Sequence, residues 1–147
     1  MFQPATSTKT RIEYEPREIF SASGFVDCAI WAGDARILYS SSANGKNEIW
    51  RVNSDGSNPE QLTAGANLSF GFTVSPVDGS IVFCSSENGR HSLKLMNADG
   101  KNIHLLTDGA EDIYPNFTAD GQTIVFQRGI KGNSSADAGR LFWPFSR

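Results

Sequence analysis

One segment of the chain is repeated at a fixed interval of 44 residues. Residues 53–66 read NSDGSNPEQLTAGA, and residues 97–110 read NADGKNIHLLTDGA. Over the longer stretches 37–63 and 81–107, eleven positions are identical at this offset. A third copy begins with YPNFTADGQTIVF at residues 114–126 and fades after Arg128. A repeat of this length predicts that each copy folds into one supersecondary unit and buries its apolar surface against its neighbours.

Pairs of Asn-Gly and Asp-Gly divide each copy into short strands. They are Asn44-Gly45, Asp55-Gly56, Asp78-Gly79, Asn88-Gly89, Asp99-Gly100 and Asp120-Gly121. Asn-Gly between apolar runs is the preferred dipeptide of a tight type I′ hairpin turn. We therefore predict such turns at residues 44–45 and 88–89, and turns of the same kind one strand later at 55–56 and 99–100. The pairs at 78–79 and 120–121 mark a third turn.

Each copy then contains about four short strands. The second strand is apolar at consecutive residues, at 37–39, 81–83 and 124–126, so both of its faces must be covered. No segment has a convincing helical period over three turns, and we expect little helix. A four-stranded antiparallel unit of this length, covered on both faces by copies of itself, predicts the blade of an all-β propeller. A meander or a sandwich with duplicated hairpins is the alternative.

These residues resemble the TolB-type propeller repeat. The matching stretches are VSPVDGSIVFCSSENG, EIWRVNSDGSNPEQLT and NFTADGQTIVF, and the resemblance covers residues 23–128. It departs from the pattern at Ala35, which stands where the turn glycine is expected, and at an extra residue, Val77. Because alanine resists positive φ, we expect Ala35 to avoid that conformation.

The repeats divide the chain into four parts. Residues 1–22 are a lead-in that looks like the end of a preceding blade, 23–67 and 68–111 are complete repeats, and 112–147 hold a partial third repeat with an irregular tail. Propellers have about four to eight blades. We therefore predict a propeller fragment of a longer protein, or a protomer that completes a ring with copies of itself.

Aromatic side chains and both cysteines fall at strand positions. We predict that the aromatic residues form the core between blades; they are Trp31, Trp50, Phe83, Phe117 and Phe126. Cys28 and Cys84 are not equivalent in the repeat and make no metal-binding spacing, so both are predicted to be small buried apolar residues.

The sequence contains no motif for catalysis, metal binding or a cofactor. It has neither a GxSxG elbow nor a GxxxxGK[ST] loop. His91 and His104 are not repeat equivalents, and we interpret each as a solvated surface histidine. The aspartates before glycine are explained by side-chain bonds to turn amides, since NSDGSN lacks the further carboxylates of a calcium loop. We predict no enzymatic activity, no metal and no cofactor.

Charge and hydropathy exclude two kinds of partner. The formal net charge is −3 and the 13 basic residues are scattered, which argues against nucleic acid. No apolar run is long enough to insert into a membrane. The first 20 residues lack the apolar core of a signal peptide, so either the protein stays inside the cell or its true amino terminus is missing.

Propeller topology predicts where a binding surface would lie. Loops from the fourth strand to the next first strand, and from the second strand to the third, emerge on one face. The candidate contacts are Asn44, Asn67, Asn88, Arg90, Glu111 and Asp112. The alternative for each is an ordinary solvated loop residue.

The predicted function is a non-catalytic module that binds or senses a protein partner or an envelope ligand. The resemblance implies a periplasmic or extracytoplasmic place, in a bacterial signalling protein or a periplasmic TolB-like protein, with further blades in the same chain or an oligomer. The alternative is the gating propeller of a prolyl-oligopeptidase-type serine peptidase whose catalytic domain is absent here. A remnant reading frame without a function of its own is a third possibility.

Overall fold

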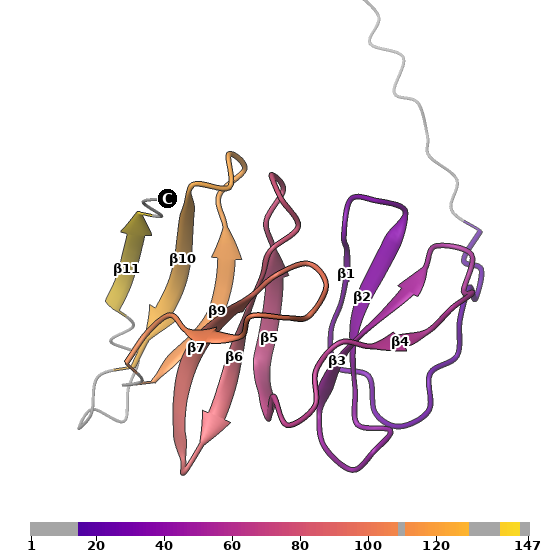
Figure 1. Ribbon diagram of the computed structural model, residues 1–147, viewed down its shortest axis with the longest axis horizontal. Coiled ribbons are helices and arrows are strands. Elements are labelled where there is room, and N and C mark those ends of the chain that lie inside the picture. The colour runs from indigo at the N-terminus through magenta and orange to yellow at the C-terminus, as the bar shows by residue number, and fades with distance from the viewer. Residues whose placement is uncertain (1–14, 109–110, 130–138, 145–147) are drawn as a thin grey trace, which may run out of the picture.

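The computed structural model describes residues 15–108, 111–129 and 139–144, and in these residues it contains eleven β-strands and no helix. The strands are β1 (Ala29–Trp31), β2 (Arg36–Ser41), β3 (Glu48–Asn53), β4 (Glu60–Gln61), β5 (Leu68–Val74), β6 (Ile81–Glu87), β7 (Arg90–Met96), β8 (His104–Leu105), β9 (Asp112–Phe117), β10 (Thr123–Arg128) and β11 (Gly139–Pro144). They form three antiparallel sheets, which we call blade 1 (β1–β4), blade 2 (β5–β8) and blade 3 (β9–β11). Figure 1 shows the blades side by side, in chain order.

Two apolar cores hold the blades together. Strand β6 presents Ile81 and Phe83 to the core shared with blade 1, and Val82 and Cys84 to the core shared with blade 3. All four side chains are buried. Consecutive apolar residues therefore pack on opposite faces of one strand, as the sequence predicted for a sheet covered on both sides.

The two Asn-Gly pairs form different turns. In blade 2, Asn88 and Gly89 both have positive φ, at 51° and 70°, and they link the paired residues Glu87 and Arg90 directly. This is the predicted type I′ hairpin. In blade 1, only Gly45 has positive φ, and the pairing stops at Ser41 and Glu48, which leaves a six-residue loop. The type I′ prediction is wrong at residues 44–45.

The Asp-Gly pairs also depart from type I′ geometry. Gly56 and Gly100 have φ of 86° and 79°, but Asp55 and Asp99 before them do not have positive φ. Each glycine amide donates to a carbonyl three residues earlier, which closes a type I turn with glycine at its left-handed end. The type I′ prediction is therefore wrong at 55–56 and 99–100 as well.

The aspartate side chains support these turns from within. In each case Oδ1 accepts the amide two residues further on, at 2.9 to 3.1 Å. The four pairs are Asp55 with Ser57, Asp78 with Ser80, Asp99 with Lys101, and Asp120 with Gln122. This hydrogen bond favours the turn because the aspartate side chain satisfies a backbone amide that would otherwise bond to water.

Ala35 contradicts the expectation from its residue type. It has φ of 59°, although it was predicted to avoid this region. Its carbonyl accepts the amide of Ser54, which lies beside the β3–β4 turn. The pairing of β2 with β3 continues up to Arg36 and Asn53, the residues next to this turn. The paired strands therefore hold Ala35 in the left-handed conformation.

A buried carboxylate fastens blade 1 to the loop that leads into blade 2. Glu48 is buried at the start of β3, and its oxygens accept three hydrogen bonds. The donors are the Thr63 hydroxyl at 2.6 Å, the Gly65 amide at 2.7 Å and the Ala66 amide at 3.1 Å. Because every donor lies between β4 and β5, Glu48 holds the connection between the blades in place.

Residues 15–28 contain no strand, and part of this segment lies against blade 1. The Ser41 hydroxyl donates to the carbonyl of Ser23 at 2.7 Å, and the Phe25 amide donates to Ser42 Oγ at 2.9 Å. Cys28, at the end of the segment, is half-buried beside the core between blades 1 and 2, whereas Cys84 is fully buried. Both thiols are free.

Candidate functional site

The predicted binding loops emerge at one end of the blades, the lower end in Figure 1. Asn44, Asn67, Asn88 and Arg90 are all exposed there. Asn44 Nδ2 donates to Gln61 Oε1 at 3.0 Å, which ties the β2–β3 loop to strand β4. Asn67 and Asn88 have φ of 47° and 51°, a region that asparagine tolerates better than most residues.

Glu111 and Asp112 are neighbours in sequence but have different surroundings. Glu111 lies 2.7 Å, through Oε2, from Nδ1 of His91 and is partly exposed. Asp112 is fully buried, and its carboxylate accepts two hydrogen bonds from Arg128, at 2.6 and 2.7 Å. This contact raises the pKa of the Arg128 guanidinium. Asp112 therefore fixes β9 to β10, and the prediction that it is a loop contact for a partner is wrong.

Two aromatic rings lie next to these loops, on the innermost strands. Phe70 on β5 and Tyr114 on β9 are 44 residues apart and so are repeat equivalents. Their ring centroids are 5.4 Å apart with an interplanar angle of 75°. Phe70 also contacts the His91 ring edge-on, at 4.8 Å. We call Phe70, His91, Glu111 and Tyr114 the aromatic patch.

Backbone strain turns the two rings out of the core. Phe70 and Tyr114 have φ of 51° and 54°, a conformation that is unfavourable for bulky side chains. In both strands the pairing with the next strand shifts register at this point. Each bulge breaks the alternation of the strand, and Tyr114 ends 54% exposed. Sequence analysis did not identify this patch, although the aromatic residues recur at the repeat interval.

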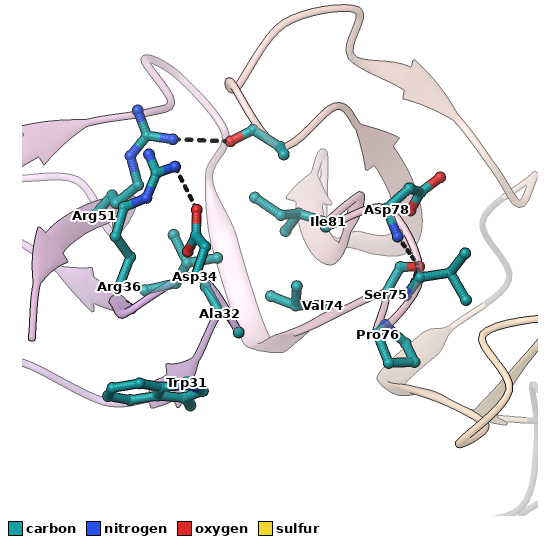
Figure 2. A pocket seen from close by; sticks show the side chains of 15 residues that line it. Trp31, Ala32, Asp34, Arg36, Arg51, Val74, Ser75, Pro76, Asp78 and Ile81 are labelled. Atoms are coloured by element: carbon teal, nitrogen blue, oxygen red, sulfur yellow. Dashed lines mark hydrogen bonds and ion pairs between the residues drawn. The ribbon is translucent and has the colours of Figure 1, made fainter.

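A groove opens at the opposite end of the molecule, between blades 1 and 2. Its volume is about 520 Å³, and Figure 2 shows the side chains that line it. Arg36 is paired with Asp34, whereas Arg51 bonds Glu60 at 2.6 Å and the Ala98 carbonyl at 3.2 Å. Both guanidinium groups are thus engaged within the protein.

A further prediction is wrong for Trp31, which lies at the rim of this groove. It was expected in the core between blades but is 59% exposed. Its neighbour Ile30 packs toward that core, so Trp31 lies on the other face of β1, against which no blade of the described residues packs. Trp50 is half-buried and stacks on Tyr39 at 6.4 Å. Phe83 and Phe126 are buried in the cores, and Phe117 packs against one of them.

Within the described ranges, no three metal-ligating side chains come together. Burial, and then the charges of Asp112 and Glu111, raise the pKa of the Cys84 thiol to about 12. Nδ1 of His104 lies 2.9 Å from the carbonyl oxygen of Asn102. In the same described part of the chain, no helix has the length and apolar character needed to cross a membrane.

Four-stranded antiparallel sheets that pack face to face in chain order, with short loops at both ends, define the blades of a β-propeller. Solved structures show which kind. TolB from Acinetobacter baumannii superposes with a TM-score of 0.74 at 21% identity, over 89% of this chain and 32% of that one. A putative TolB from Agrobacterium tumefaciens gives 0.64 at 22%, over 75% and 39%. The chain has the fold of part of a TolB-like β-propeller.

The likeness extends to a more distant structure. A chain of a nidogen/laminin complex superposes with a TM-score of 0.52 at 11% identity, over 64% of this chain and 35% of that one. The chain thus spans less than two fifths of each of these three structures. Comparison with protein-family models and with curated proteins gives no match.

Proposed function

We propose that the chain is a non-catalytic binding module that recognises a protein or an envelope ligand with the lower end of its blades. The observation that carries this proposal is the aromatic patch. Phe70 and Tyr114 leave the core at equivalent points of two repeats, at the cost of an unfavourable backbone conformation. Strain of this kind clusters at ligand-binding sites, where the surrounding structure holds a residue in an unfavourable conformation.

The surroundings of the patch have the composition of a protein-binding surface. Partly buried aromatic side chains commonly anchor a partner, and polar side chains form the rim around them. Here the rim consists of Asn67, Asn88 and Arg90, which are exposed beside the patch. Asn44 extends the same surface onto blade 1.

The patch is held rigidly before any partner arrives. His91 is fixed from one side by Glu111 and from the other by the ring of Phe70. Strand β5 is anchored in the core between blades 1 and 2 through Leu68 and Phe72, and β9 packs against the core between blades 2 and 3 through Ile113. Recognition would then proceed with little change of the backbone, as in other preorganised complexes.

The likeness to TolB-like propellers supports a proposal for the setting of this module. We propose an extracytoplasmic place, in a bacterial signalling or periplasmic protein whose further blades complete the propeller.

Selection of random dodecapeptides displayed on phage, against the full chain, tests this proposal. The variants are Phe70→Asn and Tyr114→Asn, because asparagine removes the ring and tolerates the left-handed backbone. Selected peptides should lose about tenfold or more in affinity for each variant, equivalent to about 1.4 kcal/mol. The matched control is Val77→Asn, an exposed apolar residue at the opposite end of the blades.

Two results would overturn the proposal. One is a selection that yields no peptide for the native chain. The other is a set of peptides that bind both patch variants as tightly as the native chain. Circular dichroism of each variant checks that its sheets are intact.

A further inference from the structure

On the outer face of blade 1, which points away from blade 2, side chains of β2 and β3 are buried, whereas Trp31 on β1 is exposed. Tyr39 on β2 and Val52 on β3 are 5% and 2% exposed, yet neither belongs to a core between blades. Leu38, the neighbour of Tyr39, packs toward blade 2, so Tyr39 lies on the opposite face. Tyr39 pairs with Trp50, which lies two residues before Val52 on β3, and these three side chains share that face.

Residues 17–28, which we call the lead-in segment, lie against this face. They overlap the last part of the lead-in predicted at residues 1–22. Phe20 contacts the ring of Tyr39 at 5.4 Å. The Ser42 amide donates to the Phe25 carbonyl at 3.1 Å, and the amides of Asp27 and Cys28 donate to Ser40 Oγ. An apolar contact in the middle and hydrogen bonds along β2 therefore dock the segment on blade 1.

The segment repeats a contact that is made between blades 1 and 2. A Cβ added at Gly100 of blade 2 would lie 2.6 Å from the carbonyl oxygen of Leu62, just after the last strand of blade 1. A Cβ added at Gly56, the equivalent glycine of blade 1, would lie 2.0 Å from the carbonyl oxygen of Ile19. Ile19 thus occupies, against blade 1, the place that Leu62 occupies against blade 2.

We propose that the lead-in segment covers the β2–β3 part of the outer face of blade 1 by taking the place of the last strand of a preceding blade. While it is docked, this β2–β3 part of the face is not available to a second copy of the chain. The occupant of the face is therefore residues 17–28 of the chain itself. The exposed apolar side chain of Phe25 shows that only part of the segment is committed to this contact.

The test compares Phe20→Ser with Phe25→Ser in the full chain. Both variants remove one phenylalanine from the same segment, but Phe25 is 69% exposed and Phe20 packs on Tyr39. Phe20→Ser should raise the fluorescence of bound anilinonaphthalene sulfonate about twofold or more, because the apolar face becomes accessible. It should also cause self-association in sedimentation velocity that increases with concentration. Phe25→Ser should change neither measurement.

A second variant keeps the proposal testable if Phe20→Ser does not fold. Gly56→Ala forces the Ile19 carbonyl away, and its effect should match that of Phe20→Ser. Gly89→Ala is its control, since Gly89 also has positive φ but nothing lies within 4 Å of an added Cβ. Equal dye binding and equal sedimentation for Phe20→Ser and Phe25→Ser, or for Gly56→Ala and Gly89→Ala, would overturn the proposal.

Discussion

Blades 1 and 2 are repeats of related sequence, and their equivalent threonines make the same contact. Thr63 Oγ1 accepts the Ile49 amide at 2.9 Å, and Thr107 Oγ1 accepts the Leu93 amide at 3.0 Å. The two blades differ where one partner has changed. Glu48 fastens the connection that follows blade 1, while its repeat equivalent is Ser92.

The turns show that an identical dipeptide does not fix an identical turn. Asn88-Gly89 closes a hairpin whose strands stay paired up to Glu87 and Arg90. Asn44-Gly45 lies in a loop whose flanking residues bond elsewhere, since the amide of Ser42 donates to the lead-in segment. The pairing of the strands before and after the turn, and not the turn residues alone, decides its type.

The largest effect we expect separates Glu48 from Ser92. Glu48→Ala leaves three donors without their acceptor, two of them amides between the blades. Because bonds to a buried carboxylate are strong, the free energy of unfolding should fall by about 3 kcal/mol. Ser92→Ala should change it by about 0.5 kcal/mol or less. Urea unfolding of both variants measures the difference.

Glu48→Gln provides the control for charge in this experiment. Its amide oxygen can still accept hydrogen bonds, so its loss of stability should lie between those of the alanine variant and the native chain. Equal losses for Glu48→Ala and Ser92→Ala would show that the connection between the blades does not depend on this carboxylate.

A smaller effect distinguishes steric contact from backbone conformation at glycine. Gly100→Ala adds a Cβ at 2.6 Å from the Leu62 carbonyl oxygen, in a residue with positive φ. Gly89→Ala meets no neighbour within 4 Å but has the same sign of φ. We expect a loss of about 1 kcal/mol for Gly89→Ala from the left-handed conformation alone. Gly100→Ala should cost about 2–3 kcal/mol, since the contact is with backbone.

Thermal unfolding of these two glycine variants, analysed alongside the native chain, checks the order. If Gly89→Ala proved as harmful as Gly100→Ala, the close approach of blade 1 to the β7–β8 turn would not limit the residue type there.

Ala35 and Gly79 occupy equivalent positions of the repeat, so each can be replaced by the residue that stands at the other. Both have positive φ, at 59° and 72°, but only glycine adopts it without strain. Ala35→Gly should stabilise the chain by about 0.5–1 kcal/mol, and Gly79→Ala should destabilise it by about 1 kcal/mol. Melting temperatures of the two variants should move in opposite directions. A shift in the same direction would contradict the assignment of strain to Ala35.

The fold could be predicted from the sequence because its signals are repeated. The 44-residue interval, the glycines of the turns and the consecutive apolar residues of β2 and β6 each point to blades packed on both faces. The expected likeness to TolB propellers is confirmed by the solved structures. What failed was local: Ala35 follows the ladder of its neighbours, and Trp31 lies on the face of β1 against which no blade of the described residues packs.

The candidate site was harder to predict because it depends on side-chain partners distant in sequence and on departures from regular strand geometry. Asp112 lies in a predicted loop stretch, but its burial depends on Arg128, sixteen residues later. Phe70 and Tyr114 are residue types that favour β-strands, and only the bulges in β5 and β9 turn their side chains outward. An aromatic residue in a predicted strand is expected to face the core, and the sequence does not distinguish a bulged strand from a regular one.

The smallest effect concerns the turn aspartates, where the blades again differ by one residue. The pKa of Asp55 is lowered first by the Ser57 hydroxyl and then by the Ser57 amide, whereas the pKa of Asp99 is lowered chiefly by the Lys101 amide. A carboxylate with a lowered pKa in the folded state stabilises it above the unfolded value of about 3.9, and this contribution is lost as the pH falls through the lowered folded value. Ser57→Ala should therefore raise the pKa of Asp55 toward its usual value and leave Asp99 unchanged, as carbon-detected NMR titration of the two carboxyl groups would show. It should also flatten the decline of stability below pH 4. An unchanged pKa of Asp55 would mean that the Ser57 hydroxyl does not contribute to holding this carboxylate.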